Sequence, residues 1–206
     1  MQTVNVRSLV FTALFAALFI VLSIQHLRLT LTPVPITFQT LGLILAGVFL
    51  RPKQAASSIL LVLALVAIGL PLLGGKGGIS TLIGYTGGFL FAFTFSALFI
   101  SLSMERFIRS PRLMNNKWLA AIVLFVIFEL FSSFLTYVTG VPWLMHVLNW
   151  TWSQGIQDGF LPFLLGDAIK SVLGVLITVP MLGYIKQLRE SMKGDPVSQS
   201  SSQVQL

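Results

Sequence analysis

Apolar residues form six runs along the chain, separated by short polar, charged, glycine-rich or proline-containing stretches. A helix of about 20 apolar residues crosses the hydrocarbon layer of a membrane. The pattern therefore predicts an all-α integral membrane protein with six transmembrane helices. The expected segments are residues 8–24, 39–50, 54–73, 82–104, 118–139 and 161–184. Together they form one membrane domain over residues 1–190, and residues 191–206 form a disordered polar tail.

Two breaks between segments are sharp. Arg51-Pro52-Lys53 separates the second segment from the third, because proline cannot continue a helix interior and two cations belong at a membrane edge. The glycine cluster of residues 74–78 separates the third segment from the fourth. The second segment is short for a span, so it is expected to be tilted or extended by the preceding loop.

Composition supports the membrane setting and narrows the possible chemistry. Hydrophobic residues make up 55% of the 206 positions and charged residues only 9%, against about 25% charged in soluble domains. The chain has no cysteine, and its two histidines, His26 and His146, are far apart, so neither a metal site nor a cofactor is predicted. The net charge of +7 fits membrane topology, and we predict no nucleic-acid partner.

The cations are distributed unequally between the two sides of a six-span arrangement. Ten fall on the side that holds both termini: Arg7, Arg51, Lys53, Arg106, Arg109, Arg112, Lys117, Lys186, Arg189 and Lys193. Only Arg28 and Lys76 fall on the other side, with Lys170 inside the membrane. Because cytoplasmic loops carry the excess of Lys and Arg, both termini are predicted to be cytoplasmic.

Asp167 and Lys170 lie within the sixth apolar segment, three residues apart and therefore on one face of a helix. Each charge costs about 2.5–3.5 kcal/mol at the centre of a membrane, so the pair marks a candidate functional site. Mutual neutralisation between helices is the structural alternative. Lys170 can donate and an ionised Asp167 can only accept, which suits a ligand with both acceptors and N–H donors.

Two external loops add candidate contacts. In the first, Pro33 and Pro35 stiffen the chain, and Thr37, Gln39 and Thr40 supply polar groups as it re-enters apolar surroundings.

The second loop is rich in glycine and leads to Tyr85, Gly87 and Gly88. It does not match a phosphate-binding loop, because Lys76 is followed by Gly77. It is expected either to cover an apolar ligand or to allow close helix packing.

Two further features are less specific. Ala13 and Ala17 are spaced four residues apart on the first segment, which from spacing alone favours internal helix packing. Glu129 is a second buried carboxylate candidate, and the sequence names no partner for it.

The chain resembles the BioY family, the biotin-capturing S components of energy-coupling-factor (ECF) transporters. The shared motifs are Ala13-Leu-Phe-Ala-Ala17, Pro33-Val-Pro-Ile-Thr-Phe-Gln-Thr40, Leu45-Ala-Gly47, Gly69-Leu-Pro71, Gly74-Gly-Lys-Gly-Gly78, Gly84-Tyr-Thr-Gly-Gly88 and Gly166-Asp-Ala-Ile-Lys170. Tyr85 departs from the pattern, since the family often has proline there.

The resemblance implies a six-helix S-component fold in the plasma membrane of a prokaryote, binding biotin near the external face. Asp167 and Lys170 would anchor the vitamin, with Thr37, Gln39, Tyr85, Gly87 and Gly88 bordering it. Whether Lys170 or Lys76 meets the biotin carboxylate stays open.

The implied partners are a transmembrane coupling subunit and two ABC-type ATPase subunits within the lipid bilayer. The resemblance reverses the spacing argument for Ala13 and Ala17 and makes them the surface that contacts the coupling subunit. No enzyme activity is predicted. The alternatives are an S component for another small vitamin, or a proton-coupled secondary transporter that acts alone through Asp167 or Glu129.

Overall fold

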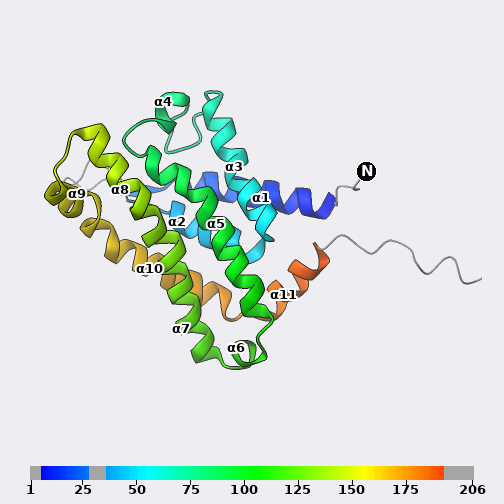
Figure 1. Cartoon of the computed structure of the whole chain (residues 1–206). Coiled ribbons are helices and arrows are strands. Elements are labelled where there is room, and N and C mark those ends of the chain that lie inside the picture. Colours follow the sequence, from blue (N-terminus) through cyan, green and yellow to red (C-terminus); the bar gives the residue numbers. More distant parts are fainter. Residues whose placement is uncertain (1–5, 28–35, 193–206) are drawn as a thin grey trace, which may run out of the picture.

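The computed structural model describes residues 6–27 and 36–192, and the chain in these ranges is almost entirely helical (Figure 1). The longer helices are α1 (Val6–Ile24), α2 (Gln39–Phe49), α3 (Pro52–Ala67), α5 (Gly87–Ile108), α7 (Lys117–Phe128), α8 (Leu135–Leu148), α10 (Leu161–Thr178) and α11 (Leu182–Ser191). The shorter elements are β1 (His26–Leu27), β2 (Ile36–Thr37), α4 (Ile79–Leu82), α6 (Pro111–Asn115), the π-helix η1 (Glu129–Phe134) and α9 (Trp152–Gly159).

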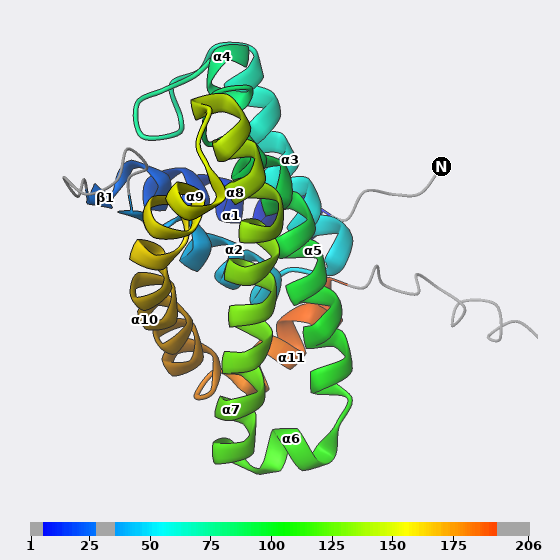
Figure 2. The same cartoon turned by 60° about the vertical axis from the view of Figure 1, so that its left-hand side comes forward.

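Helix α2 lies at the centre of the bundle, in contact with α1, α5 and α10 (Figures 1 and 2). Every residue from Thr40 to Phe49 is buried, which explains why this helix is apolar on all sides rather than along one stripe. The short strands β1 and β2 pair antiparallel just before it. The position of α2 therefore brings its first residues, beside β2, into the interior of the protein.

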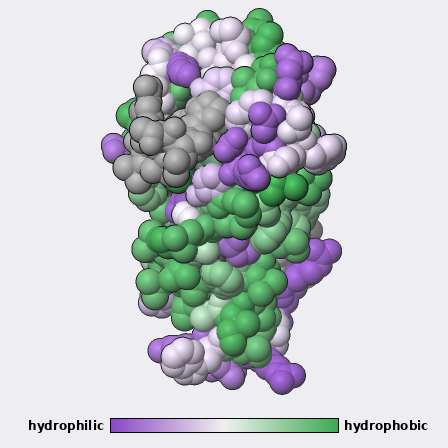
Figure 3. Space-filling view, turned by 90° about the vertical axis from the view of Figure 1, so that its left-hand side faces the viewer, coloured by the Kyte–Doolittle hydropathy of each residue, from purple (hydrophilic) through white to green (hydrophobic). Residues whose placement is uncertain are grey.

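Four helices of the described chain are long and apolar enough to cross a membrane: Val6–Ile24, Gly87–Ile108, Lys117–Leu148 and Trp152–Thr178. Helices α2 and α3 are shorter apolar helices. The surface agrees with a membrane setting, because a hydrophobic band separates two hydrophilic ends on the face shown in Figure 3. Exposed Val138, Leu165 and Leu176 contribute to the apolar surface of the bundle. The protein is thus a multi-pass membrane protein.

Several helix ends differ from those that the sequence predicts. The segment predicted over 54–73 is helical only to Ala67, because Gly69 adopts a positive φ of 107°. Helix α5 begins at Gly87 rather than 82 and continues to Ile108. The segment 118–139 is part of a longer run, α7–η1–α8, so much of the predicted external connection 140–159 is helical.

The sixth segment, predicted over 161–184, is also corrected. Helix α10 ends at Thr178 and α11 begins at Leu182, and Pro180 lies in the break between them, where it has no N–H to continue the hydrogen bonds of α10. The predicted tail starts too early, since Ser191 ends α11 and Met192 is buried in the core. The rest of that tail, 193–206, lies outside the described residues, as do Pro33 and Pro35.

A buried arginine connects α11 to the C-terminal end of α2. The Arg189 guanidinium donates hydrogen bonds to the carbonyl oxygens of Gly47, Val48 and Leu50 at 2.6–3.0 Å, and to that of Ser101 at 2.9 Å. These α2 carbonyls lack partners within their own helix, and a cation is favourable there. Burial lowers the pKa of Arg189 to about 10, so the side chain stays charged at neutral pH.

Candidate binding site

Asp167 and Lys170 form an ion pair on one face of α10. Only 4% of Asp167 and 5% of Lys170 is exposed, so both charges are removed from solvent and from lipid. A buried ion pair is tolerated only when further hydrogen bonds satisfy its remaining donors and acceptors. The surroundings of the pair therefore decide what it can do.

The Asp167 carboxylate joins three helices. Thr40 Oγ1, in the first turn of α2, donates to Asp167 Oδ1 at 3.1 Å. The Tyr137 hydroxyl, on α8, donates to Oδ2. With Lys170 as a third donor, the carboxylate is held in a fixed orientation by α2, α8 and α10.

Lys170 connects this cluster to strand β2. Its Nζ donates to the carbonyl oxygen of Thr37 at 2.9 Å, and the Thr37 hydroxyl donates to Gln39 Oε1 at 2.9 Å. The predicted site residues Thr37, Gln39, Asp167 and Lys170 are thus brought together in one network. The sequence could not show that these residues meet, since 133 residues separate Thr37 from Lys170.

One residue of this network, Tyr137, is only weakly indicated by the sequence. Tyr137 follows Ser132, Ser133 and Thr136, a polar run within an otherwise apolar helix, and it is not among the site residues predicted from the sequence. All four are buried. A polar run of this kind in a membrane helix was the available sign that the α8 face points into the protein.

The polar run begins in the π-helix η1, where Glu129 is the first residue. A π-helix inserts an extra residue into an α-helix and so changes which side chains face inward. Such insertions are frequent at functional sites. The Glu129 carboxylate faces Ser171 on α10 and lies within range of the Asp167 and Lys170 charges. One carboxylate oxygen of Glu129 and the Ser171 hydroxyl are nevertheless buried without a hydrogen bond within 6–27 and 36–192.

Aromatic and apolar side chains cover the network on one side. The rings of Tyr137 and Phe160 form a T-shaped pair with 4.9 Å between their centroids. Tyr85 and Trp150 pack against the same hydrophobic cluster, which also contains Phe163. The arrangement combines a buried donor and acceptor pair with an apolar aromatic wall, as small-molecule sites commonly do.

Gly87 and Gly88, also predicted to border the ligand, lie where two helices pack closely together. Gly87 and Gly88 are buried against Trp143 of α8, and a Cβ on Gly88 would lie 2.7 Å from the carbonyl oxygen of Thr139. These two glycines therefore permit the close approach of α5 and α8. The indole N–H of Trp143 donates to the carbonyl oxygen of Gly84 at 2.9 Å, which fixes the turn before α5.

Lys76 lies beside Tyr85 in the glycine-rich loop. Its Nζ is 3.5 Å from the Tyr85 hydroxyl and 5.6 Å from the centre of the ring. Lys76 is exposed and Tyr85 is half-buried against the aromatic cluster. The loop thus offers a second cation, paired with an aromatic ring, in addition to Lys170.

Ala13 and Ala17 are both exposed on α1, whereas Ala16 is buried. Their side chains therefore face away from the helices that α1 contacts, α2 and α3.

Among the described residues, no group of three or more acidic, histidine or cysteine side chains could hold a metal ion.

Comparison with known proteins gives consistent matches. The sequence model of the BioY family matches residues 1–187. The biotin transporter BioY of Rhizobium etli is 35% identical over 87% of this chain and 96% of its own length. The probable biotin transporter BioY of Bacillus subtilis is 37% identical over 81% of this chain and 86% of its own.

A solved structure matches as well. The crystal structure of the S-component for biotin from an ECF-type ABC transporter superimposes with a TM-score of 0.76. It is 29% identical in sequence, and the match covers 85% of this chain and 90% of that one.

The helical bundle, its apolar surface and the buried polar network define a multi-pass membrane protein with the fold of a transporter S component. The chain belongs to the BioY family. The resemblance found in the sequence is thereby confirmed. The family consists of transport proteins, so the prediction that the chain is not an enzyme is confirmed too.

Proposed function

We propose that this chain is a biotin-binding S component of an ECF-type transporter, in the plasma membrane. The names of its relatives and of the matching structure support biotin as the substrate. The observation that carries the proposal is the buried Asp167–Lys170 pair, which is hydrogen-bonded to Thr40, Tyr137 and the carbonyl of Thr37. A membrane protein retains such a network chiefly for binding or transport.

The pair has unused hydrogen-bonding capacity that suits a ureido ring, which carries two N–H donors and one carbonyl acceptor. A carboxylate accepts about four hydrogen bonds, and Asp167 receives three from the part of the chain that the structure describes. Its Oδ2 atom, which has Tyr137 as donor, can accept a fourth from a ureido N–H. Lys170 has three N–H donors, of which two are engaged by described residues, so the third would serve a carbonyl or carboxylate oxygen of the ligand.

The remaining predicted residues would surround the rest of the ligand. Within residues 6–27 and 36–192, the Gln39 side chain is engaged only through its oxygen, by Thr37, so its amide nitrogen could donate to the ligand. Tyr85, beside Gly87 and Gly88, would cover the apolar part of the bicycle and the aliphatic tail. Lys76, next to Tyr85, is the second candidate to meet the biotin carboxylate.

The proposed topology has six spans and both termini in the cytoplasm. Helices α2 and α3 would supply the two shorter spans. Biotin would bind at the external side, and a transmembrane coupling subunit with two ABC-type ATPase subunits would supply the energy. Ala13 and Ala17, which are exposed and small, would let the coupling subunit approach α1 closely.

Calorimetric titration of the purified chain with biotin and with other vitamins tests the substrate. Of the vitamins tested, we expect biotin to be the one that binds tightly. Asp167→Asn and Lys170→Met are each expected to weaken biotin binding by about 2 kcal/mol or more, roughly thirtyfold in Kd, because each leaves a buried partner unpaired.

The double variant Asp167→Asn with Lys170→Met separates binding from folding, because it removes both charges and leaves neither unpaired. It is expected to fold and still to bind biotin poorly. Lys117→Met removes an exposed cation at the start of α7 and serves as the control. Wild-type biotin affinity in all three site variants would contradict the assignment of Asp167 and Lys170 to the biotin site. Tighter binding of another vitamin would contradict the assignment of biotin as the substrate.

A further inference from the structure

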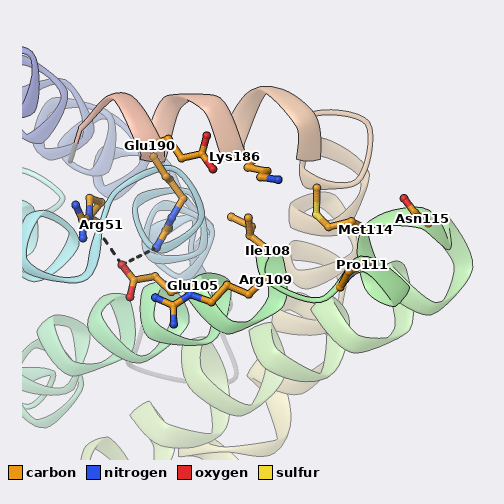
Figure 4. Close-up of a pocket in the computed structure, with 10 residues that line it drawn as sticks. Arg51, Glu105, Ile108, Arg109, Pro111, Met114, Asn115, Lys186 and Glu190 are labelled. Carbon is orange, nitrogen blue, oxygen red and sulfur yellow. Dashed lines mark ion pairs between the residues drawn. The ribbon is translucent and has the colours of Figure 1, made fainter. Parts of the chain in front are cut away.

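A cavity of about 510 Å³ lies where the end of α5, α6, α11 and the α2–α3 turn meet (Figure 4). Figure 2 shows α6 at the end of the bundle opposite α4, with α11 in the same half of the molecule. None of the residues that line the cavity belongs to the polar network around Asp167, so the two sites are separate. In Figure 4, side chains from α11 and from α5 and α6 lie on opposite sides of the open space.

The cavity is lined by more cations than carboxylates. The cations are Arg51, Arg109, Lys186 and Arg189, and the carboxylates are Glu105 and Glu190, which leaves a net charge of +2. Charge of one sign inside a concave site with low-dielectric walls attracts ions of the opposite sign. The cavity therefore favours an anion.

Two of the cations are already engaged. Glu105 Oε1 lies 3.8 Å from Arg51 Nε and 4.0 Å from an Arg189 nitrogen. The Arg189 guanidinium is also bound to backbone carbonyls. Within the described chain, Arg109 and Lys186 form no ion pair and are both exposed, so they remain available to a ligand.

Exposed aromatic residues place this cavity at the level of the lipid headgroups. Trp118 is 84% exposed and follows the cavity-lining Asn115 by three residues, and Tyr184 is 53% exposed and precedes Lys186 by two. Exposed tryptophan and tyrosine in membrane proteins concentrate at the boundary between hydrocarbon and water. The cavity therefore opens where phospholipid phosphates lie.

We propose that this cavity binds the headgroup of an anionic phospholipid of the phosphatidylglycerol type. Its phosphate would meet Arg109 and Lys186, and its hydroxyl groups would donate to Glu190. Ile108 and Met114 supply apolar wall for the part of the lipid nearest its acyl chains. Basic pockets between membrane helices bind anionic headgroups in this way.

Native mass spectrometry of the detergent-purified chain tests the proposal, with phosphatidylglycerol and phosphatidylcholine of identical acyl chains as probes. Wild type is expected to retain phosphatidylglycerol in preference to phosphatidylcholine. The double variant Arg109→Gln with Lys186→Gln is expected to lose about tenfold or more in affinity for phosphatidylglycerol, with little change for phosphatidylcholine.

The matched control is Arg106→Gln with Lys117→Gln, which removes two exposed cations that do not line the cavity. It is expected to retain phosphatidylglycerol as wild type does, and equal thermal midpoints of both double variants would show that each is folded. An equal loss in the control would overturn the proposal in favour of general surface attraction. Displacement of the lipid by millimolar inorganic phosphate would assign the cavity to a soluble anion instead.

Discussion

The residue that most changes the view of the site is Tyr137. Asp167 and Lys170 were predictable, because charges inside an apolar segment are costly and therefore conspicuous. Tyr137 was not, because its hydroxyl meets Asp167 from another helix, 30 residues away in the chain. No periodicity in the sequence encodes that distance, and only the buried polar run before Tyr137 hinted at it.

Tyr137→Phe should lower stability while leaving the packing of the ring against Phe160 intact. The change removes one donor from a buried carboxylate, and hydrogen bonds to charged groups contribute about 1.5–3 kcal/mol. We expect a lower thermal unfolding midpoint in detergent and weaker biotin binding. Tyr184→Phe, at an exposed position on α11, is the control. An unchanged midpoint for Tyr137→Phe would show that the hydroxyl is not needed to hold Asp167.

Among the elements, the helices were predictable and their ends were not. Hydropathy located α1, α2, α3, α5, α7 and α10 because their apolar runs are long, but it missed most of α8 and did not separate α11 from α10. The ends depend on local backbone conformation, such as the positive φ of Gly69 and the break at Pro180. The π-helix η1 could not be predicted at all, since its extra residue leaves hydropathy unchanged.

Close packing of α5 against α8 depends on Gly88, and this makes a prediction at the level of elements. Gly88→Ala would place a Cβ 2.7 Å from the Thr139 carbonyl oxygen, and overpacking of this kind costs about 1–3 kcal/mol. The thermal midpoint should therefore fall. Gly183→Ala is the matched control, because nothing lies within 4 Å of a Cβ there, and it should leave stability unchanged or slightly higher. A similar fall for both variants would contradict the packing role of Gly88.

At the scale of the whole molecule, changes on the exposed face of α1 should affect assembly with the coupling subunit and leave biotin binding unchanged. If Ala13 and Ala17 contact the coupling subunit, replacing both with leucine should prevent co-purification with that subunit, because the larger side chains keep the helices apart. Biotin binding by the isolated chain should not change, since both residues face away from the bundle. Val138→Phe adds similar bulk to an exposed position on α8 and should leave assembly intact. Co-purification of the double leucine variant at the wild-type level would show that this face of α1 does not contact the coupling subunit.

The bond between Arg189 and α2 has a consequence for how the protein is made. A chain is synthesised from its N-terminus, so α2 enters the membrane long before Arg189 exists. Until then, the carbonyl groups of Gly47, Val48 and Leu50 have no guanidinium partner. The hydrogen bonds at the end of α2, the most deeply buried helix, therefore form only after α11 has been synthesised. Until then, the core around α2 lacks its Arg189 contacts.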